Sequence, residues 1–180
     1  MREKYNKYKI FDTERLILKA TSENDSKFLF QLLNAENWIQ YIGDKNINSI
    51  DDAKVYVNTK IVPQQKSHGY SVYTLIRKKD NLKIGTCGLY NRDGIDGFDV
   101  GFAILPKYEN MGYGFESAEK IINISFKEFS LDFLSAITTK DNMSSIKLIE
   151  KLGFQFIRSI KLPDNEKEFQ LFETINPISG

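Results

Sequence analysis

Two hydrophobic patterns alternate along the chain and predict its strands and helices. Arg15–Ala20 (RLILKA) alternates apolar and charged residues, as a strand with one buried face does. Tyr70–Arg77 and Leu82–Tyr90 are rich in β-branched and aromatic residues, and the turn-like Lys79-Asp80-Asn81 between them predicts a hairpin. Further strands are expected over Phe98–Leu105, which Pro106 ends, Phe133–Thr138, Phe154–Leu162 and Glu168–Phe172.

Apolar residues at intervals of three and four positions predict the helices. Ser22–Asn37 has this spacing, as do Gly114–Phe129 and Asn142–Leu152, and Gly153 supplies the left-handed residue that ends the last of them. Asp51–Ile61 is a weaker helical segment because it contains Val and Thr. The order is a hairpin meander followed by strand–helix–strand–helix–strand, which predicts an α/β fold with a mixed sheet flanked by helices.

Length and composition place the chain among compact globular domains. Its 180 residues fit one domain of ordinary size, and 41% hydrophobic with 13% aromatic residues are enough for a large core. We find no repeat, linker or low-complexity tract, so we expect a single domain over residues 1–180 with its core at about 13–173. Lys and Arg number 25 against 24 Asp and Glu, which gives no general attraction to nucleic acid or to anionic lipid.

Cysteine content and hydropathy limit the expected location of the protein and the partners it could bind. Cys87 is the only cysteine, so no internal disulfide forms, no Cys-rich metal site exists, and a reducing cytoplasmic location is expected. Its place in a predicted strand is typical of a small core residue. No stretch approaches the roughly 20 apolar residues of a membrane span. We therefore expect no metal, no nucleic acid and no membrane among the partners.

The segment at 107–117 (KYENMGYGFES) has the composition of a phosphate-binding loop. It follows a strand, contains Gly112 and Gly114, and leads directly into an amphipathic helix. Glycines let a backbone turn tightly against a ligand, and a helix start adds free N–H donors and a positive dipole end. A two-glycine turn before a helix is also ordinary loop chemistry. The loop lacks the Lys-Ser/Thr of a nucleotide triphosphate loop and the third glycine of a dinucleotide site, which disfavours both chemistries.

The ordered set of motifs resembles the GNAT superfamily of N-acetyltransferases. The motifs are FDVGFAILP, KYENMGYG, FLSAITTK, Asp141-Asn142-Met143-Ser144-Ser145 and Glu150-Lys151-Leu152-Gly153-Phe154. Thr13-Glu14-Arg15-Leu16 and Tyr41-Ile42-Gly43-Asp44 also resemble the opening segments of its ribosomal-protein-N-acetyltransferase-like branch. The resemblance implies a mostly antiparallel sheet splayed between its fourth and fifth strands, with acetyl-coenzyme A held in the cleft.

The resemblance also implies which residues hold the cofactor. The pantothenate arm would pair with the backbone of Phe102, Ala103 and Ile104, and the amide of Asn142 would bind a pantetheine carbonyl. Asn142 could equally do no more than cap its helix. The chain departs from the family at Glu109, where Gln or Arg is usual, and we expect that side chain to point into solvent. The pyrophosphate would lie on the backbone N–H groups of a run that comprises Asn110, Met111, Gly112, Tyr113, Gly114 and Phe115.

The family reaction is direct attack of an amine on the thioester, which needs a proton acceptor and a donor to the departing sulfur. Many relatives place a Tyr where this chain has Ile149, and the branch it resembles uses a serine, here Ser145. Asp99 stands where many relatives have a glutamate base, and its shorter side chain favours a water relay. Surface or capping duty is the alternative for Ser145, and an ordinary strand position is the alternative for Asp99. Tyr90 and Glu173 are further candidates at the amine, whereas His68 is expected to be structural.

The sequence thus predicts an N-acetyltransferase that uses acetyl-coenzyme A as co-substrate and a primary amine as acceptor. The acceptor could be a protein N-terminus, a polyamine-like metabolite or an amino antibiotic. Trp38 and Tyr41 would line the substrate access or belong to the core. The alternative is a non-catalytic acyl-coenzyme A sensor or regulatory module, which Glu109, Met111 and the absent Tyr would suit.

Overall fold

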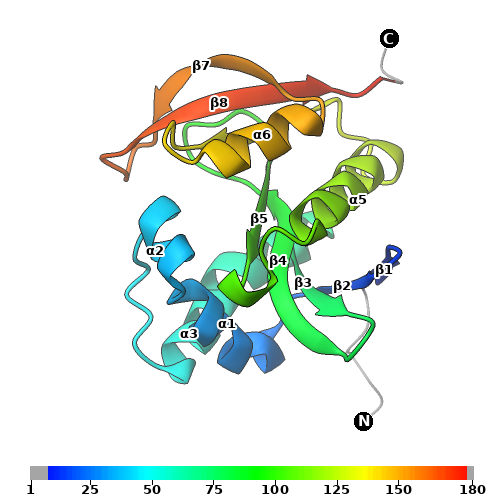
Figure 1. Ribbon diagram of the computed structural model, residues 1–180, viewed down its shortest axis with the longest axis vertical. Coiled ribbons are helices and arrows are strands. Elements are labelled where there is room, and N and C mark those ends of the chain that lie inside the picture. The colour runs from blue at the N-terminus through cyan, green and yellow to red at the C-terminus, as the bar shows by residue number, and fades with distance from the viewer. Residues whose placement is uncertain (1–7, 178–180) are drawn as a thin grey trace.

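The computed structural model describes residues 8–177 and contains one eight-stranded sheet in the order β1-β2-β3-β4-β5-β6-β8-β7. All neighbouring pairs are antiparallel except β5 and β6 (Figure 1). The strands are β1 (Phe11–Asp12), β2 (Leu16–Ala20), β3 (Val72–Arg77), β4 (Leu82–Tyr90), β5 (Asp99–Ile104), β6 (Phe133–Thr138), β7 (Gln155–Lys161) and β8 (Glu168–Ile175). The expected α/β class and mostly antiparallel sheet are confirmed.

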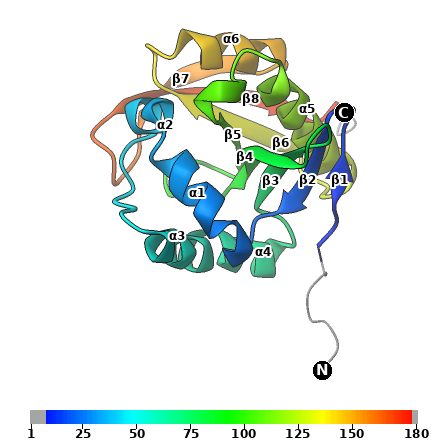
Figure 2. The ribbon, with the colours of Figure 1, turned by 60° about the horizontal axis from the view of Figure 1, so that its bottom comes forward.

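Helices cover both faces of the sheet. The α-helices are α1 (Ser26–Leu33), α2 (Glu36–Tyr41), α3 (Ile50–Tyr56), α4 (Val62–His68), α5 (Tyr113–Lys127) and α6 (Met143–Lys151). The shorter turns are η1 (Glu23–Asp25), the π-helical η2 (Val57–Ile61) and η3 (Pro106–Tyr108). The helices from α1 to α4 lie on one face, and α5 and α6 lie on the other (Figure 2).

Burial explains these positions. Ala118, Ile121 and Ile124 of α5 are at most 3% exposed and pack on strands β2 to β5 in the main core cluster. On the opposite face, α1 and α3 bury their apolar residues against each other and against Val72. Both faces of the sheet are therefore packed near its centre. This packing holds β5, the strand that borders the cleft, in place.

Two helical predictions were wrong in their extent. The segment expected as one helix over Ser22–Asn37 is interrupted at Asn34 and Ala35, and a second helix follows. The Asn34 amide donates to the carbonyls of Phe30 and Ile47, so a side chain competes with the helical backbone and ends α1. This second helix, α2, ends at Tyr41 rather than at Asn37.

The other difference concerns the segment expected over Asp51–Ile61. Helical structure continues to His68 through the π-helical turn η2, in which the Val62 N–H donates to the Val57 carbonyl. Pro63 follows directly and has no N–H for the ordinary four-residue bond, which accounts for the wider turn. His68 consequently lies at the end of a helix. The left-handed Gly153 after α6 is confirmed, with φ of +92°.

The sheet splays where β5 meets β6. Their ladder has a single register pair, Asp99 with Ser135, whereas β4 and β5 are paired along the whole of β5. Beyond Val100 the β6 side of β5 therefore has no strand partner. Not counting the two-residue β1, these are the fourth and fifth strands of the sheet, so the expected splay is confirmed.

Candidate active site

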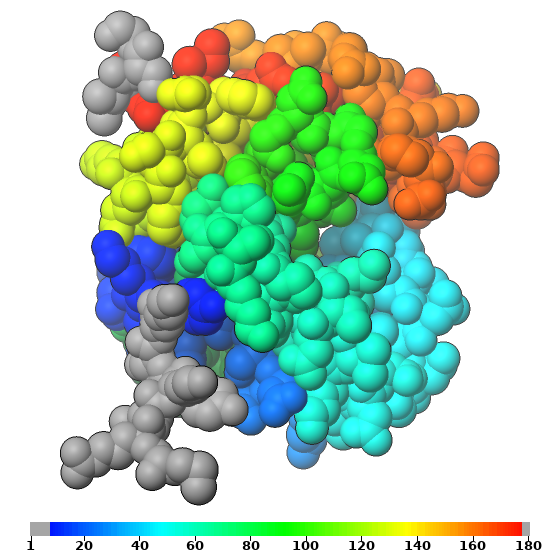
Figure 3. Space-filling model, turned by 180° about the vertical axis from the view of Figure 1, so that it is seen from behind, coloured from blue at the N-terminus to red at the C-terminus, as the bar shows by residue number. Residues whose placement is uncertain are grey.

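A cavity of about 860 Å³ occupies the splay. Its walls come from β5, the loop before α5, the start of α6, helix α2, the β4–β5 loop and the β7–β8 hairpin. The space-filling view shows the surface hollowed between the cyan residues after α2 and the orange β7–β8 hairpin (Figure 3). The Lys167 ammonium donates to the Gln40 carbonyl at 3.0 Å, which joins the hairpin to α2 along one side.

The loop before α5 presents a row of free backbone donors at one end of this cavity. No N–H group from Asn110 to Phe115 donates to another group among residues 8–177, because the loop precedes the first intrahelical bond. Gly112 has φ of +84°, the left-handed conformation that directs the chain into the helix. The donors and the helix N-terminus together suit an anion of the size of a pyrophosphate.

Arg15 holds this loop, and the sequence analysis gave it no role. Its Nη1 donates to the Met111 carbonyl at 2.9 Å, and its Nε donates to Glu116 at 2.7 Å. The guanidinium also lies over the Tyr113 ring, 4.4 Å from the centroid. The only sequence signal for Arg15 was its place in the Thr13-Glu14-Arg15-Leu16 motif, since the contact joins residues 96 positions apart. A cation therefore lies beside the loop although Met111 has no charge.

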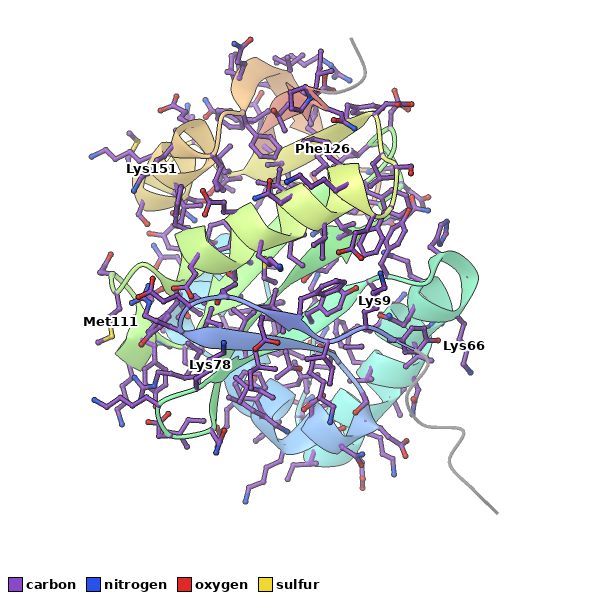
Figure 4. The ribbon with its side chains drawn as sticks, turned by 90° about the vertical axis from the view of Figure 1, so that its right-hand side faces the viewer. Lys9, Lys66, Lys78, Met111, Phe126 and Lys151 are labelled. Carbon is purple, nitrogen blue, oxygen red and sulfur yellow. The ribbon has the colours of Figure 1, made fainter. Side chains whose placement is uncertain are left out.

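The side chains of Met111 and Glu109 in this loop point in different directions. Met111 is half exposed and points away from the molecule at the tip of the loop (Figure 4). Glu109 is exposed, as expected, and its carboxylate accepts a hydrogen bond from the Asn37 amide of α2. That bond turns the carboxylate toward α2, which is how the chain accommodates an acidic residue near an anion site.

The β5 edge offers alternate residues to the cavity. The Phe98 carbonyl accepts a hydrogen bond from the Ser135 N–H of β6, and the Leu105 N–H donates to the Ile84 carbonyl of β4. Backbone groups alternate in direction along a strand, so those of the even-numbered residues of β5 point into the splay. Phe102 and Ile104 therefore direct their backbone groups into the cavity. The Ile104 carbonyl already accepts from Asn37, at 3.1 Å.

Ala103 requires a correction. The same alternation points its N–H and carbonyl toward β4, where it pairs with Thr86. A Cβ added at Gly85 of β4 would approach the Ala103 carbonyl oxygen to 2.3 Å. The prediction that its backbone pairs with a ligand in the cleft is therefore wrong, although the residue lines the cavity.

The start of α6 forms the opposite wall. Asn142 is the N-cap, and its Oδ1 accepts from the Ser145 N–H at 3.2 Å. The capping interpretation is thus confirmed, and the Asn142 Nδ2 has no acceptor among the described residues. Ser145 is partly buried and lines the cavity, and no described residue bonds its hydroxyl. Both side chains retain a donor that a ligand could use.

The acceptor end of the cavity contains a buried ion pair. Arg92 Nε donates to both oxygens of Asp99, at 2.8 and 3.0 Å, and the carboxylate is 1% exposed. Burial raises the pKa of Asp99 above its ordinary value, and the Arg92 charge opposes that shift. Tyr90 lies beneath the Arg92 guanidinium, and burial raises its pKa so far that the phenol stays neutral. Asp99 and Tyr90 were predicted from the sequence, whereas Arg92 was not.

Other candidates lie elsewhere or have structural roles. His68 is exposed outside the main cavity and bonds Ser67. Glu173 does not line the main cavity, whereas Trp38 and Tyr41 do. Cys87 is fully buried in the core, and burial raises the pKa of its thiol to about 12, which confirms a packing role. No trio of His, Cys, Asp or Glu side chains in residues 8–177 is placed to hold a metal ion.

No helix in residues 8–177 is both long and apolar enough to cross a lipid bilayer.

Comparison with known proteins agrees with this geometry. The family model described as the acetyltransferase (GNAT) domain matches residues 15–155. An uncharacterized N-acetyltransferase of Bacillus subtilis, YoaA, is 26% identical over 153 residues, which are 82% of this chain and 84% of that protein. A GNAT-family acetyltransferase from Bacillus anthracis superposes with a TM-score of 0.76 at 20% identity, over 93% of this chain and 99% of that one.

A further solved structure contains the coenzyme. The ribosomal-protein α-N-acetyltransferase RimL, solved in complex with coenzyme A, superposes with a TM-score of 0.74 at 16% identity, over 93% of this chain and 98% of that one.

Proposed function

The chain belongs to the GNAT acetyltransferase family, and we propose that it transfers the acetyl group of acetyl-coenzyme A to a primary amine by direct attack within a ternary complex. The observation that carries this proposal is the row of unpaired N–H groups from Asn110 to Phe115 at one end of a cavity whose other end holds Asp99. Acetyl-coenzyme A would supply an activated thioester between these ends.

The cofactor end is proposed to bind mainly through the backbone. The N–H groups from Asn110 to Phe115 hold the pyrophosphate, and Arg15 keeps their loop in place. The backbone groups of Phe102 and the N–H of Ile104 pair with the pantothenate arm, and Asn142 Nδ2 donates to its carbonyl. A further backbone N–H on the same edge of β5 would suit the acetyl oxygen, where a fixed donor stabilises the negative charge that develops during attack.

Two side chains are proposed to handle protons. The amine must lose a proton as its nitrogen bonds to the acetyl carbon, and Asp99 accepts that proton through a water molecule. The carbon–sulfur bond breaks as the new amide forms, and the Ser145 hydroxyl donates to the departing thiolate. Serine and the Asp99–Arg92 pair then return to their starting states by proton exchange with solvent.

An amine library tests this function. Purified protein with acetyl-coenzyme A should release free thiol with at least one class of primary amine, and mass spectrometry should show the amine gaining an acetyl group. Calorimetry should show acetyl-coenzyme A binding whether the protein is an enzyme or a non-catalytic sensor. Binding without thiol release across the library would favour the sensor and contradict the enzyme.

A further inference from the structure

The acceptor end of the cavity is rich in hydrogen-bond donors that have no acceptor. Arg92 uses only Nε in its bonds to Asp99, and neither terminal nitrogen donates to any residue in 8–177. The Arg92 side chain is 32% exposed and lines the cavity, so a ligand can reach these nitrogens. A guanidinium with two free nitrogens matches the paired oxygens of a carboxylate.

Lys45 adds a second cation to the same wall. It follows α2, lines the cavity, and forms no ion pair with a described residue. Burial lowers the pKa of Lys45, and the nearby charges of Arg92 and Lys60 lower it further, which shows that cations are close to one another here. Because Asp99 pairs with Arg92, the ammonium of Lys45 remains available to an anionic group of a ligand.

Trp38 provides an independent sign of a missing acceptor. It is 7% exposed and lines the cavity, yet its indole Nε1 has no hydrogen-bond partner among residues 8–177. Buried N–H groups are normally paired, so a donor remains unsatisfied in this wall of the cavity. Besides Asp99, four carboxylates line the cavity, those of Glu36, Asp93, Glu109 and Asp164. All four residues are exposed, and none forms an ion pair with Lys45 or Arg92 within residues 8–177.

We propose that Arg92 and Lys45 bind a carboxylate of the acceptor, so that the substrate is a primary amine with a carboxylate group on the same molecule. This inference rests on the proposed function. The carboxylate could belong to a free amino acid or to an acidic residue at the start of a peptide, and the chemistry at Arg92 and Lys45 is the same. Spermidine and aminoglycosides, which are cationic throughout, would be disfavoured by Lys45.

Matched amines test the proposal. An α-amino acid is compared with its amide, an Asp-Ala dipeptide amide with an Asn-Ala dipeptide amide, and spermidine serves as the cationic reference. The carboxylate member of at least one pair should have a kcat/KM roughly tenfold or more above its neutral partner, since a charged hydrogen bond is lost in the neutral one. The pair that shows the effect identifies the source of the carboxylate.

Variants locate the effect. Lys45→Gln should reduce the carboxylate preference roughly fivefold, through the KM for the amine. Arg92→Lys keeps a cation opposite Asp99 but removes the fork, so it should reduce the preference without unfolding the protein, which a thermal melt checks. The matched control is Lys66→Gln, because Lys66 extends into solvent from α4, away from the main cavity (Figure 4).

The outcomes distinguish a failure of the proposed carboxylate site from a failure of the proposed acetyltransferase function. Thiol release with equal kcat/KM within both pairs, or with spermidine as the best substrate, overturns the carboxylate site and leaves the acetyltransferase intact. A carboxylate preference that Lys45→Gln and Arg92→Lys both leave unchanged also overturns it. Absence of thiol release with every amine overturns the proposed function and the inference with it.

Discussion

The two ends of the cleft present different kinds of groups to a ligand. The proposed cofactor end presents backbone groups, namely the N–H row from Asn110 to Phe115 and the free β5 edge. The proposed acceptor end presents charged side chains, above all Arg92, Asp99 and Lys45. Backbone donors depend on conformation and tolerate many sequences, whereas side-chain charges change with a single substitution. One end can therefore stay constant while the other sets the substrate.

The largest expected effect comes from the acceptor end. Asp99→Asn removes the proposed proton acceptor with little change of shape, so kcat/KM for the amine should fall about 100-fold near neutral pH. The Kd for acetyl-coenzyme A should stay unchanged, which calorimetry measures. Asp96→Asn, an exposed aspartate in the β4–β5 loop, is the matched control and should leave both quantities alone.

The pH profile gives the same variant a second readout. Burial raises the pKa of Asp99, and the group must be deprotonated to accept a proton. Activity of the unmodified protein should therefore decline as the pH falls through a value above the ordinary pKa of an aspartate, and Asp99→Asn should lose that acidic limb. An identical limb in both proteins would exclude Asp99 as the base.

The next effect belongs to the cofactor end. Gly112→Val forces a branched residue into a left-handed conformation, which costs about 1–2 kcal/mol, and places a Cβ about 3.1 Å from Arg15 Nη2. The Kd for acetyl-coenzyme A should rise roughly 30-fold as the N–H row is displaced. Gly153→Val is the control, because Gly153 is also left-handed but has no neighbour within 4 Å. It should lose stability without losing affinity, and equal affinities in the two variants would contradict the loop's role.

Ser145 lies between the two ends and should affect only the chemical step. Removing a donor to a developing thiolate in Ser145→Ala should lower kcat roughly 20-fold, while acetyl-coenzyme A affinity changes less than about threefold. Single-turnover kinetics and calorimetry separate these quantities. Ser159→Ala, on the exposed strand β7, is the control. Collapsed affinity with normal turnover of the bound complex would assign Ser145 to binding instead.

The smallest expected effect comes from Arg15, which supports the backbone donors indirectly. Arg15→Met removes the ion pair with Glu116 and the bond to the Met111 carbonyl, but the loop keeps its glycine-dependent course. The Kd for acetyl-coenzyme A should rise about fivefold to tenfold, with kcat unchanged at saturation. Arg158→Met on exposed β7 controls for the loss of a cation. A change in kcat without a change in Kd would show that Arg15 does not act through the loop.

The sequence predicted local features better than long-range ones. The β3–β4 hairpin, the left-handed Gly153 and the Asn142 cap follow from a few adjacent residues, and all three are present. The interruption at Asn34 depends on the distant Ile47 carbonyl, so the helical spacing around Asn34 gave no sign of it. The wrong backbone direction at Ala103 has a similar origin, because strand register is set by the partner strands.

The same distinction between local and long-range features applies to the site. The N–H row could be found from Gly112 and the following helix because a loop and a helix start are contiguous in the sequence. Arg15 reaches the loop before α5, and Lys45 reaches the cleft, each from a distant segment. Only the fold shows that Arg92 pairs with Asp99 across the β4–β5 loop. Glu109 likewise meets Asn37 only after α2 has packed beside β5.

The central claim is that the backbone N–H groups from Asn110 to Phe115 hold the diphosphate of acetyl-coenzyme A. A titration followed by two-dimensional amide NMR tests it most directly. These amides should show the largest shifts, and coenzyme A should reproduce them, whereas pantetheine without phosphates should not. Saturable binding that leaves these amides in place and perturbs residues elsewhere would contradict the account.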